Sequence, residues 1–72
     1  MPKLIVVEPL AHGWAVRHEE GGVSQVFRSG AKAEAAALSL GARLALAGIA
    51  AEIRVYLRNG ALGGRFLCPA AA

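Results

Sequence analysis

The chain carries few side chains that could perform catalysis or hold a metal ion. His12, His18 and Cys68 are its only soft metal ligands, and none of them shows the paired spacing of a structural zinc site. His12 could act as a base and Cys68 as a nucleophile, yet no acidic residue stands at a spacing that would orient either of them. No glycine-rich phosphate loop precedes the helical stretch. These residue types predict a protein that is not an enzyme and that needs no cofactor and no metal.

Arginines form the one charge pattern that points toward a ligand. The net charge is +3, and the last predicted hairpin places Arg54 opposite Arg65, with Tyr56 and Arg58 nearby. Like charges directly opposite each other destabilise a sheet, and a phosphate backbone bound there would relieve the repulsion. Tyr56 could stack on a base of the same ligand. In the alternative interpretation, which we favour, the arginines spread into solvent and repel weakly at physiological salt. Anion or nucleic-acid binding is therefore the second hypothesis for this chain.

Three strands are expected to precede the helix. The run "LIVV" in "KLIVVEP" predicts a strand with both faces covered, and "WAVRH" alternates as a strand that a glycine turn returns through "VSQVFR". Phe27 shares a face with Trp14 and Val16 if the turn lies at residues 20–22. Trp14 is therefore predicted to anchor the core at the end of a hairpin rather than to contact a ligand.

A helix is predicted from the N-cap Ser29 to about Gly48, and it is apolar on two faces. One face is expected to cover the sheet, and Gly41 falls in a polar seam between the two faces. A helix with two apolar faces needs a second partner, which another copy of the chain could supply. The sheet-facing stripe consists of Ala33, Ala36, Ala37, Leu40, Leu44 and Ala47. The predicted oligomer interface consists of Leu38, Ala42, Ala45, Leu46 and Ile49.

The dipeptide Asn59-Gly60 predicts the last hairpin, "EIRVYLR" followed by "ALGGRFL". A two-residue turn there would pair Leu57 with Leu62 and Ile53 with Phe66. One face of this hairpin would then carry Ile53, Val55, Leu57, Leu62 and Phe66.

Together these elements predict an α+β fold, an antiparallel sheet in the order β-β-β-α-β-β with a single helix packed on one face. Residues 1–68 form one small domain, and the tail 69–72 is expected to fray. A chain of 72 residues with one cysteine has a small core and no internal disulfide, so we expect a homo-oligomer, first of all a dimer. The expected function is that of a non-enzymatic protein-interaction module.

Composition also bears on where the protein works. The long apolar stretch after Lys32 contains Arg43 and several glycines and alanines, which disfavour insertion into a membrane. The run "LIVV" is too short for the apolar region of a secretory signal. A single thiol is typical of a reducing compartment. We therefore expect a basic cytoplasmic protein that does not contact membranes.

The segments "VVEP", "GWAVRHEEG", "AKAEAAALSLGARLA" and "IRVYLRNGALGGRF" together resemble the short bacterial proteins grouped as domain of unknown function 2188. The resemblance covers nearly the whole chain. In that family a serine or threonine usually stands just before the helix lysine, whereas here Gly30 and Ala31 separate Ser29 from Lys32. The resemblance implies a compact sheet-and-helix fold and brings no established activity and no catalytic residues. The matching positions are Pro9, Gly13, Trp14, Val16, Lys32, Glu34, Ala35, Ala45, Val55 and Gly60.

Overall fold

The computed structural model describes residues 1–19 and 21–71, with the side chains of Val23 and Ser24 left out. Within these residues the elements follow the predicted order β-β-β-α-β-β. They are β1 (Lys3–Leu10), β2 (Gly13–His18), β3 (Gly22–Phe27), α1 (Gly30–Leu46), β4 (Ala51–Tyr56) and β5 (Leu62–Cys68). The α+β fold with one helix packed on a sheet is therefore confirmed.

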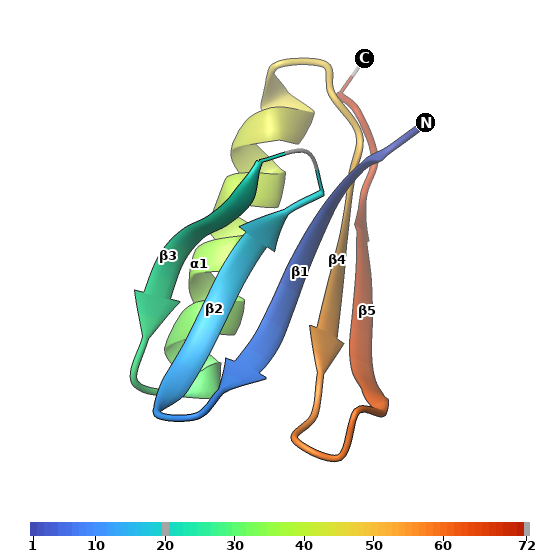
Figure 1. The fold of residues 1–72 in the computed structure, drawn as a ribbon. Coiled ribbons are helices and arrows are strands. Elements are labelled where there is room, and N and C mark those ends of the chain that lie inside the picture. Colours follow the sequence, from blue (N-terminus) through green and yellow to red (C-terminus); the bar gives the residue numbers. More distant parts are fainter. Residues whose placement is uncertain (20, 72) are drawn as a thin grey trace.

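The strands form one sheet in the order β3-β2-β1-β4-β5, and α1 lies across one face of it (Figure 1). The pairings β1–β2, β2–β3 and β4–β5 are antiparallel, whereas β1 and β4 run parallel at the centre. The expectation of a wholly antiparallel sheet is wrong at this one pair. The helix carries the chain back along the sheet, so β4 begins at the same end as β1 and runs in the same direction.

The central position of β1 explains why its sequence is apolar on both faces. Ile5 and Val7 are fully buried on the face that the helix covers. Val6 points to the other face and is only 8% exposed, although no helix covers it. Its neighbours in the sheet are Arg17 on β2 and Arg54 on β4, whose aliphatic stems can shield it. Both faces of β1 are therefore covered within one chain. The apolar sequence of this strand does not require a second copy.

Small residues let the helix lie close to the sheet. Ser29 caps the helix as predicted, because its Oγ accepts a hydrogen bond from the backbone N–H of Lys32 at 3.1 Å. Ala33, Ala37 and Gly41 are the buried helical residues. The position predicted for Gly41, in a polar seam, is therefore wrong. A methyl group there would lie 2.7 Å from Ile53 Cδ1, so the missing side chain is what permits this close approach.

Trp14 occupies the position predicted for it. It pairs with Phe27 across β2 and β3, and both side chains pack against the buried core cluster. The predicted centre of the turn between these strands includes Glu20, which lies outside the described residues. The β2–β3 pairing shifts register between Val16 and Arg17.

The last hairpin keeps its predicted register along most of its length but turns differently. Ile53 faces Phe66 and Arg54 faces Arg65, as expected. The N–H of Gly60 donates to the carbonyl of Leu57 at 2.9 Å. The N–H of Leu57 donates to the carbonyl of Ala61 at 2.8 Å. Leu57 therefore lies opposite Ala61 and not opposite Leu62. The turn has three residues and ends at Gly60, whose φ of +86° favours glycine.

A second irregularity restores the register farther from the turn. Tyr56 pairs with Leu62 and Val55 pairs with Gly64, so Gly63 has no residue opposite it. Because an extra residue reverses the side-chain alternation, Leu62 lies on the same face as Tyr56. The prediction that Leu62 shares a face with Ile53 and Phe66 is wrong for this reason.

The tail is tied to the helix at one point. The N–H of Ala71 donates to the carbonyl of Ala45 at 2.9 Å, which holds the chain beyond β5 against the end of α1. Fraying of the tail over 69–72 stays a prediction, and Ala72 lies outside the described residues. In the described part of the chain, no helix is both long and apolar enough to span a bilayer.

Candidate functional site

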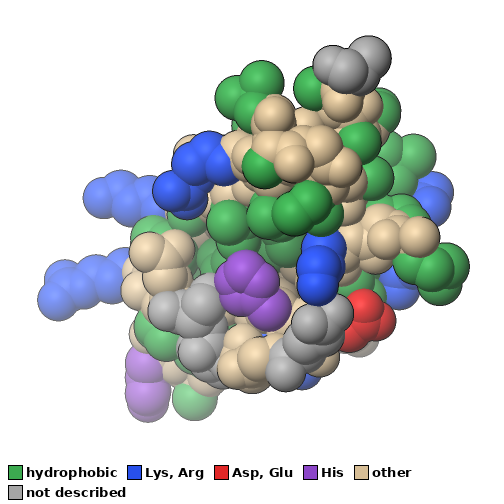
Figure 2. Space-filling view, turned by 90° about the horizontal axis from the view of Figure 1, so that it is seen from above, with side chains coloured by type: hydrophobic (Ala, Val, Ile, Leu, Met, Phe, Trp, Pro, Cys, Tyr) green, Lys and Arg blue, Asp and Glu red, His purple; other side chains and the backbone are tan. Residues whose placement is uncertain are grey.

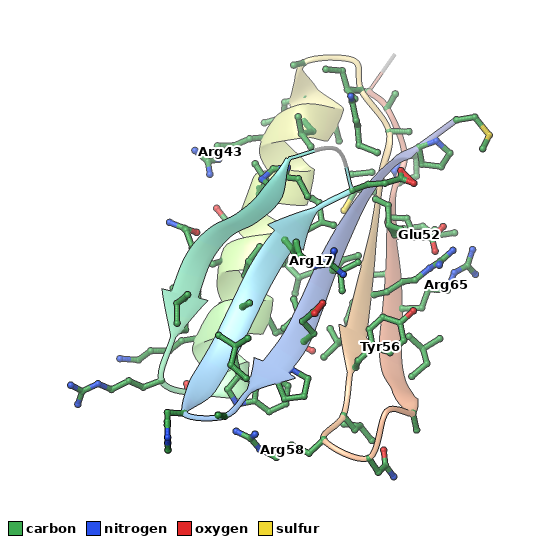
Figure 3. The ribbon with its side chains drawn as sticks, viewed as in Figure 1. Arg17, Arg43, Glu52, Tyr56, Arg58 and Arg65 are labelled. Carbon is green, nitrogen blue, oxygen red and sulfur yellow. The ribbon has the colours of Figure 1, made fainter. Side chains whose placement is uncertain are left out.

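The arginine face lies on the side of the sheet opposite to the helix. Its members are Glu52, Arg54 and Tyr56 on β4 and Arg65 on β5, and the predicted pairing of Arg54 with Arg65 is confirmed. Figure 3 shows the side chains of Glu52 and Arg65 pointing toward one another. Glu52 had no part in the sequence-based hypothesis, and it changes what this face can do.

Glu52 binds both arginines. Its Oε2 accepts hydrogen bonds from Nε of Arg54 at 2.5 Å and from Nε of Arg65 at 3.0 Å, and its Oε1 accepts a further one from Nη2 of Arg65 at 3.2 Å. The Glu52 side chain is 10% exposed, which limits the screening of these ion pairs by water. The two like charges therefore share a carboxylate and need no external phosphate to offset their repulsion.

These contacts alter the ionisation of all three groups. The hydrogen bonds from Arg65 and then Arg54 lower the pKa of Glu52 from 4.5 to about 2, because they favour its charged form. The hydrogen bonds to Glu52 correspondingly raise the pKa of Arg54 and that of Arg65. The cluster remains fully ionised at neutral pH.

Replacing Glu52 with glutamine should change how stability depends on pH. Because the folded pKa lies below the ordinary 4.5, the carboxylate contributes its full stabilisation above that pH. This contribution is lost as pH falls from 4.5 toward 2. We expect Glu52→Gln to be less stable than the wild type at pH 7 and to lose less stability over that acid window, as measured by urea unfolding at each pH.

The control for this prediction is Glu34→Gln, which removes one negative charge from the helix and leaves Glu52 in place. This variant should still lose the stabilisation from Glu52 as pH falls from 4.5 toward 2, as the wild type does. A Glu52→Gln variant with wild-type stability at pH 7 and a wild-type acid profile would contradict the assigned role of Glu52.

The remaining arginines near this face are also engaged within the chain. Arg17 Nη2 lies 2.8 Å from Glu8 Oε1, and Arg17 Nε donates to the same oxygen at 3.0 Å. Arg58 Nη1 donates to the carbonyl of Leu10 at 2.8 Å, and its guanidinium lies 5.2 Å from the centroid of the Trp14 ring. Arg58 thus joins the β4–β5 turn to the β1–β2 turn.

A shallow groove lies beside β1, β2 and β4 and the start of the β4–β5 turn. Its walls include Glu8, Arg17, Tyr56 and Arg58. A second, smaller hollow of about 120 Å³ lies beside His18 and Leu44, well below the roughly 300 Å³ at which small-molecule pockets begin. Among the residues that the structure describes, no three His, Cys, Asp or Glu side chains gather as a metal site.

The predicted oligomer interface on the helix is only partly exposed. Leu38 packs against the core cluster, and the carbonyl of Ala45 accepts from Ala71 in the tail. Ala42 and Ile49 are exposed, and Leu46 is 80% exposed. The outer helix face is therefore narrower than expected, with its large apolar side chains at the end where the helix stops. Seen from that end, hydrophobic side chains form separate groups among the backbone and the basic and histidine side chains (Figure 2).

The edge strand β5 carries a second group of exposed apolar side chains that the sequence-based hypothesis missed. Leu62 is 50% exposed, Phe66 37% and Leu67 58%. Phe66 lies on the helix side of the sheet, opposite Ile53, and Leu67 lies on the other side, opposite Glu52. The alternation of "LGGRFLC" could have revealed that apolar residues occupy both faces of this strand, but its position at the edge depends on the strand order.

Comparison of the chain with protein-family models, with curated proteins and with solved structures gives no match.

Proposed function

We propose that this chain is a small protein-interaction module that assembles with copies of itself. The observation that supports this proposal is the balance of its apolar side chains. Four large side chains, Ile5, Val7, Val16 and Ile53, are fully buried. Nine large hydrophobic residues in the described part of the chain are exposed. A second copy would cover part of this apolar surface and add the burial that a chain of this size lacks.

Binding of a polyanion at the arginine face is the weaker proposal. Arg54 and Arg65 share Glu52, Arg17 contacts Glu8, and Arg58 contacts Leu10 and Trp14. A phosphate would have to compete with these contacts. If this face nevertheless binds nucleic acid, the affinity should fall with rising salt and should be lost when Arg54 and Arg65 are both replaced with alanine.

The proposed module needs no catalytic group. Membership of the family that the sequence resembles, domain of unknown function 2188, is part of the same proposal. We place its action in the cytoplasm, where the half-buried, unpaired thiol of Cys68 would remain reduced.

The solution mass tests this proposal. We expect light scattering to give a mass above the 7.4 kDa of one chain, and the fraction assembled should rise with protein concentration. Because the contacts are mainly apolar, the assembly should persist at high salt. A folded chain with the monomer mass at every concentration would refute the proposal. An assembly that dissociates in high salt would show that charges, and not apolar contacts, hold it together.

A further inference from the structure

We propose that the second copy pairs edge to edge along β5, antiparallel, with Phe66 opposite the partner's Phe66. This inference rests on the proposed function, because it names the surface through which the chain assembles. It would join two five-stranded sheets into one continuous sheet, with the helix of each copy on the same side.

The free edge of β5 has the chemistry of a strand that accepts another strand. β5 is bonded to β4 alone, so its outer edge presents unpaired backbone N–H and C=O groups. Natural edge strands avoid such pairing with charged side chains, above all lysine, with prolines or with bulges, and the bulge of β5 lies at Gly63. Beyond that bulge, residues 64–68 contain no lysine and no proline, and the one charge, Arg65, is bound by Glu52. The occupant that fits this edge is therefore another extended backbone.

The apolar side chains favour β5 over the opposite edge of the sheet. Leu62, Phe66 and Leu67 are all exposed along β5. On the described part of β3, the large exposed hydrophobic residue is Val26. Among the side chains that the structure describes, those exposed along β5 would therefore bury more apolar surface in such a pairing than Val26 on β3.

Charge and geometry then favour one register over its two neighbours. Paired side chains point to the same face, so a two-fold axis must pass through one residue of β5 and its copy. An axis at Arg65 would place two guanidinium groups side by side, which is unfavourable. An axis at Leu67 would set Arg65 opposite the partner's Pro69, which has no N–H to donate.

An axis at Phe66 avoids both problems. It stacks Phe66 against the partner's Phe66 on the helix side of the sheet. On the other side it sets Arg65, whose guanidinium donates to Glu52, against the apolar side chain of the partner's Leu67 and not against a second guanidinium. The remaining pair in this register is Gly64 with the partner's Cys68. The five residues 64–68 then pair with their copies.

The Gly64 and Cys68 pair provides a direct test. Opposed residues in an antiparallel sheet have Cα atoms about 4.5–5.5 Å apart, which suits a disulfide. Within one chain these two residues are four apart along a strand, about 13 Å, and cannot be bridged. We therefore expect Gly64→Cys, in a glutathione buffer, to form at least about tenfold more disulfide-linked dimer than the control variant, because assembly raises the effective thiol concentration.

The control is Ala31→Cys, which adds the same thiol at an exposed helical position away from β5. Equal linkage of the two variants, with a wild-type chain that assembles, would overturn the β5 pairing and leave the proposed function standing. A wild-type chain that stays monomeric would overturn both.

Amide hydrogen exchange of the unaltered chain gives a second test that does not depend on how Gly64→Cys folds. The amides of residues 64–68 that face outward should exchange more slowly at concentrations where the chain is assembled than after dilution to monomer. Slowing confined to residues 42–49 would overturn the β5 pairing and move the interface to the end of the helix.

Discussion

Replacing Ile53 with alanine should leave most of the chain unfolded at 25 °C. Ile53 is fully buried on β4, and its Cδ1 lies where the helix approaches the sheet at Gly41. Truncating a buried isoleucine to alanine costs about 2–5 kcal/mol. A domain of this size commonly has only about 3–5 kcal/mol of stability, so the loss is comparable with the whole. Circular dichroism and urea unfolding measure the effect.

A graded series makes this prediction specific to the core. Ile53→Val removes one methyl group and should cost about 0.5–1.5 kcal/mol, leaving the chain folded. Val26→Ala, at an exposed position of the β3 edge, should change stability by less than about 0.5 kcal/mol. An Ile53→Ala variant as stable as Val26→Ala would show that β4 does not form the centre of the core.

Replacing Gly13 with alanine should lower the free energy of unfolding by about 1–3 kcal/mol, the usual cost of overpacking. Gly13 is buried at the start of β2, and a methyl group there would lie 2.6 Å from the carbonyl oxygen of Phe27. Because that oxygen belongs to the backbone, the end of β3 itself would have to move. Trp14 pairs with Phe27, so tryptophan fluorescence should report the displacement during urea unfolding.

Gly21→Ala is the matched control for this change. It makes the same substitution in the turn after β2, where a methyl group would have no neighbour within 4 Å. Its stability should stay within about 0.5 kcal/mol of the wild type. Equal effects of the two substitutions would contradict the close contact between Gly13 and β3.

Local sequence patterns were sufficient to predict the elements of this fold and most of its hairpin register. The alternation in β2 and β3 placed Phe27 with Trp14, and Ser29 marked the start of the helix. The alternation in the last hairpin paired Ile53 with Phe66. The face on which Leu62 lies could not be predicted from the sequence. The three-residue turn shifts the register by one residue, and the unopposed Gly63 shifts it back, so only Leu62 between them changes face.

The parallel pair at the centre of the sheet depends on information that no local pattern contains. The run at Ile5, Val6 and Val7 indicated a strand covered on both faces. A second copy and a central position in the sheet explain such a strand equally well, and only the strand order distinguishes them. Here β1 lies between β2 and β4, so its own chain covers it.

The counter-ion of the arginine face could have been predicted. Glu52 stands two residues before Arg54, and strand alternation puts both on one face of β4. The confirmed register then brings Arg65 to the same carboxylate. The repulsion between Arg54 and Arg65, which motivated the nucleic-acid hypothesis, is therefore offset within the chain. The exposed apolar side chains are then the stronger indication of a partner.

The apolar surface also gives a reason why assembly and stability should be coupled. Leu46 ends the helix and Ile49 follows it in the connection to β4, whereas Leu62, Phe66 and Leu67 lie along the β5 edge. A monomer would expose these groups to water, while its core contains few large side chains. Covering either group with a second copy would stabilise the folded chain by mass action.

The central claim is tested most directly by the urea midpoint of the wild-type chain, measured over a wide range of protein concentration. If copies of the folded chain bind one another, the midpoint should rise steadily with concentration, since assembly stabilises only the folded state. A midpoint that stays constant from the lowest to the highest concentration would contradict the claim that this protein is completed by its own copies.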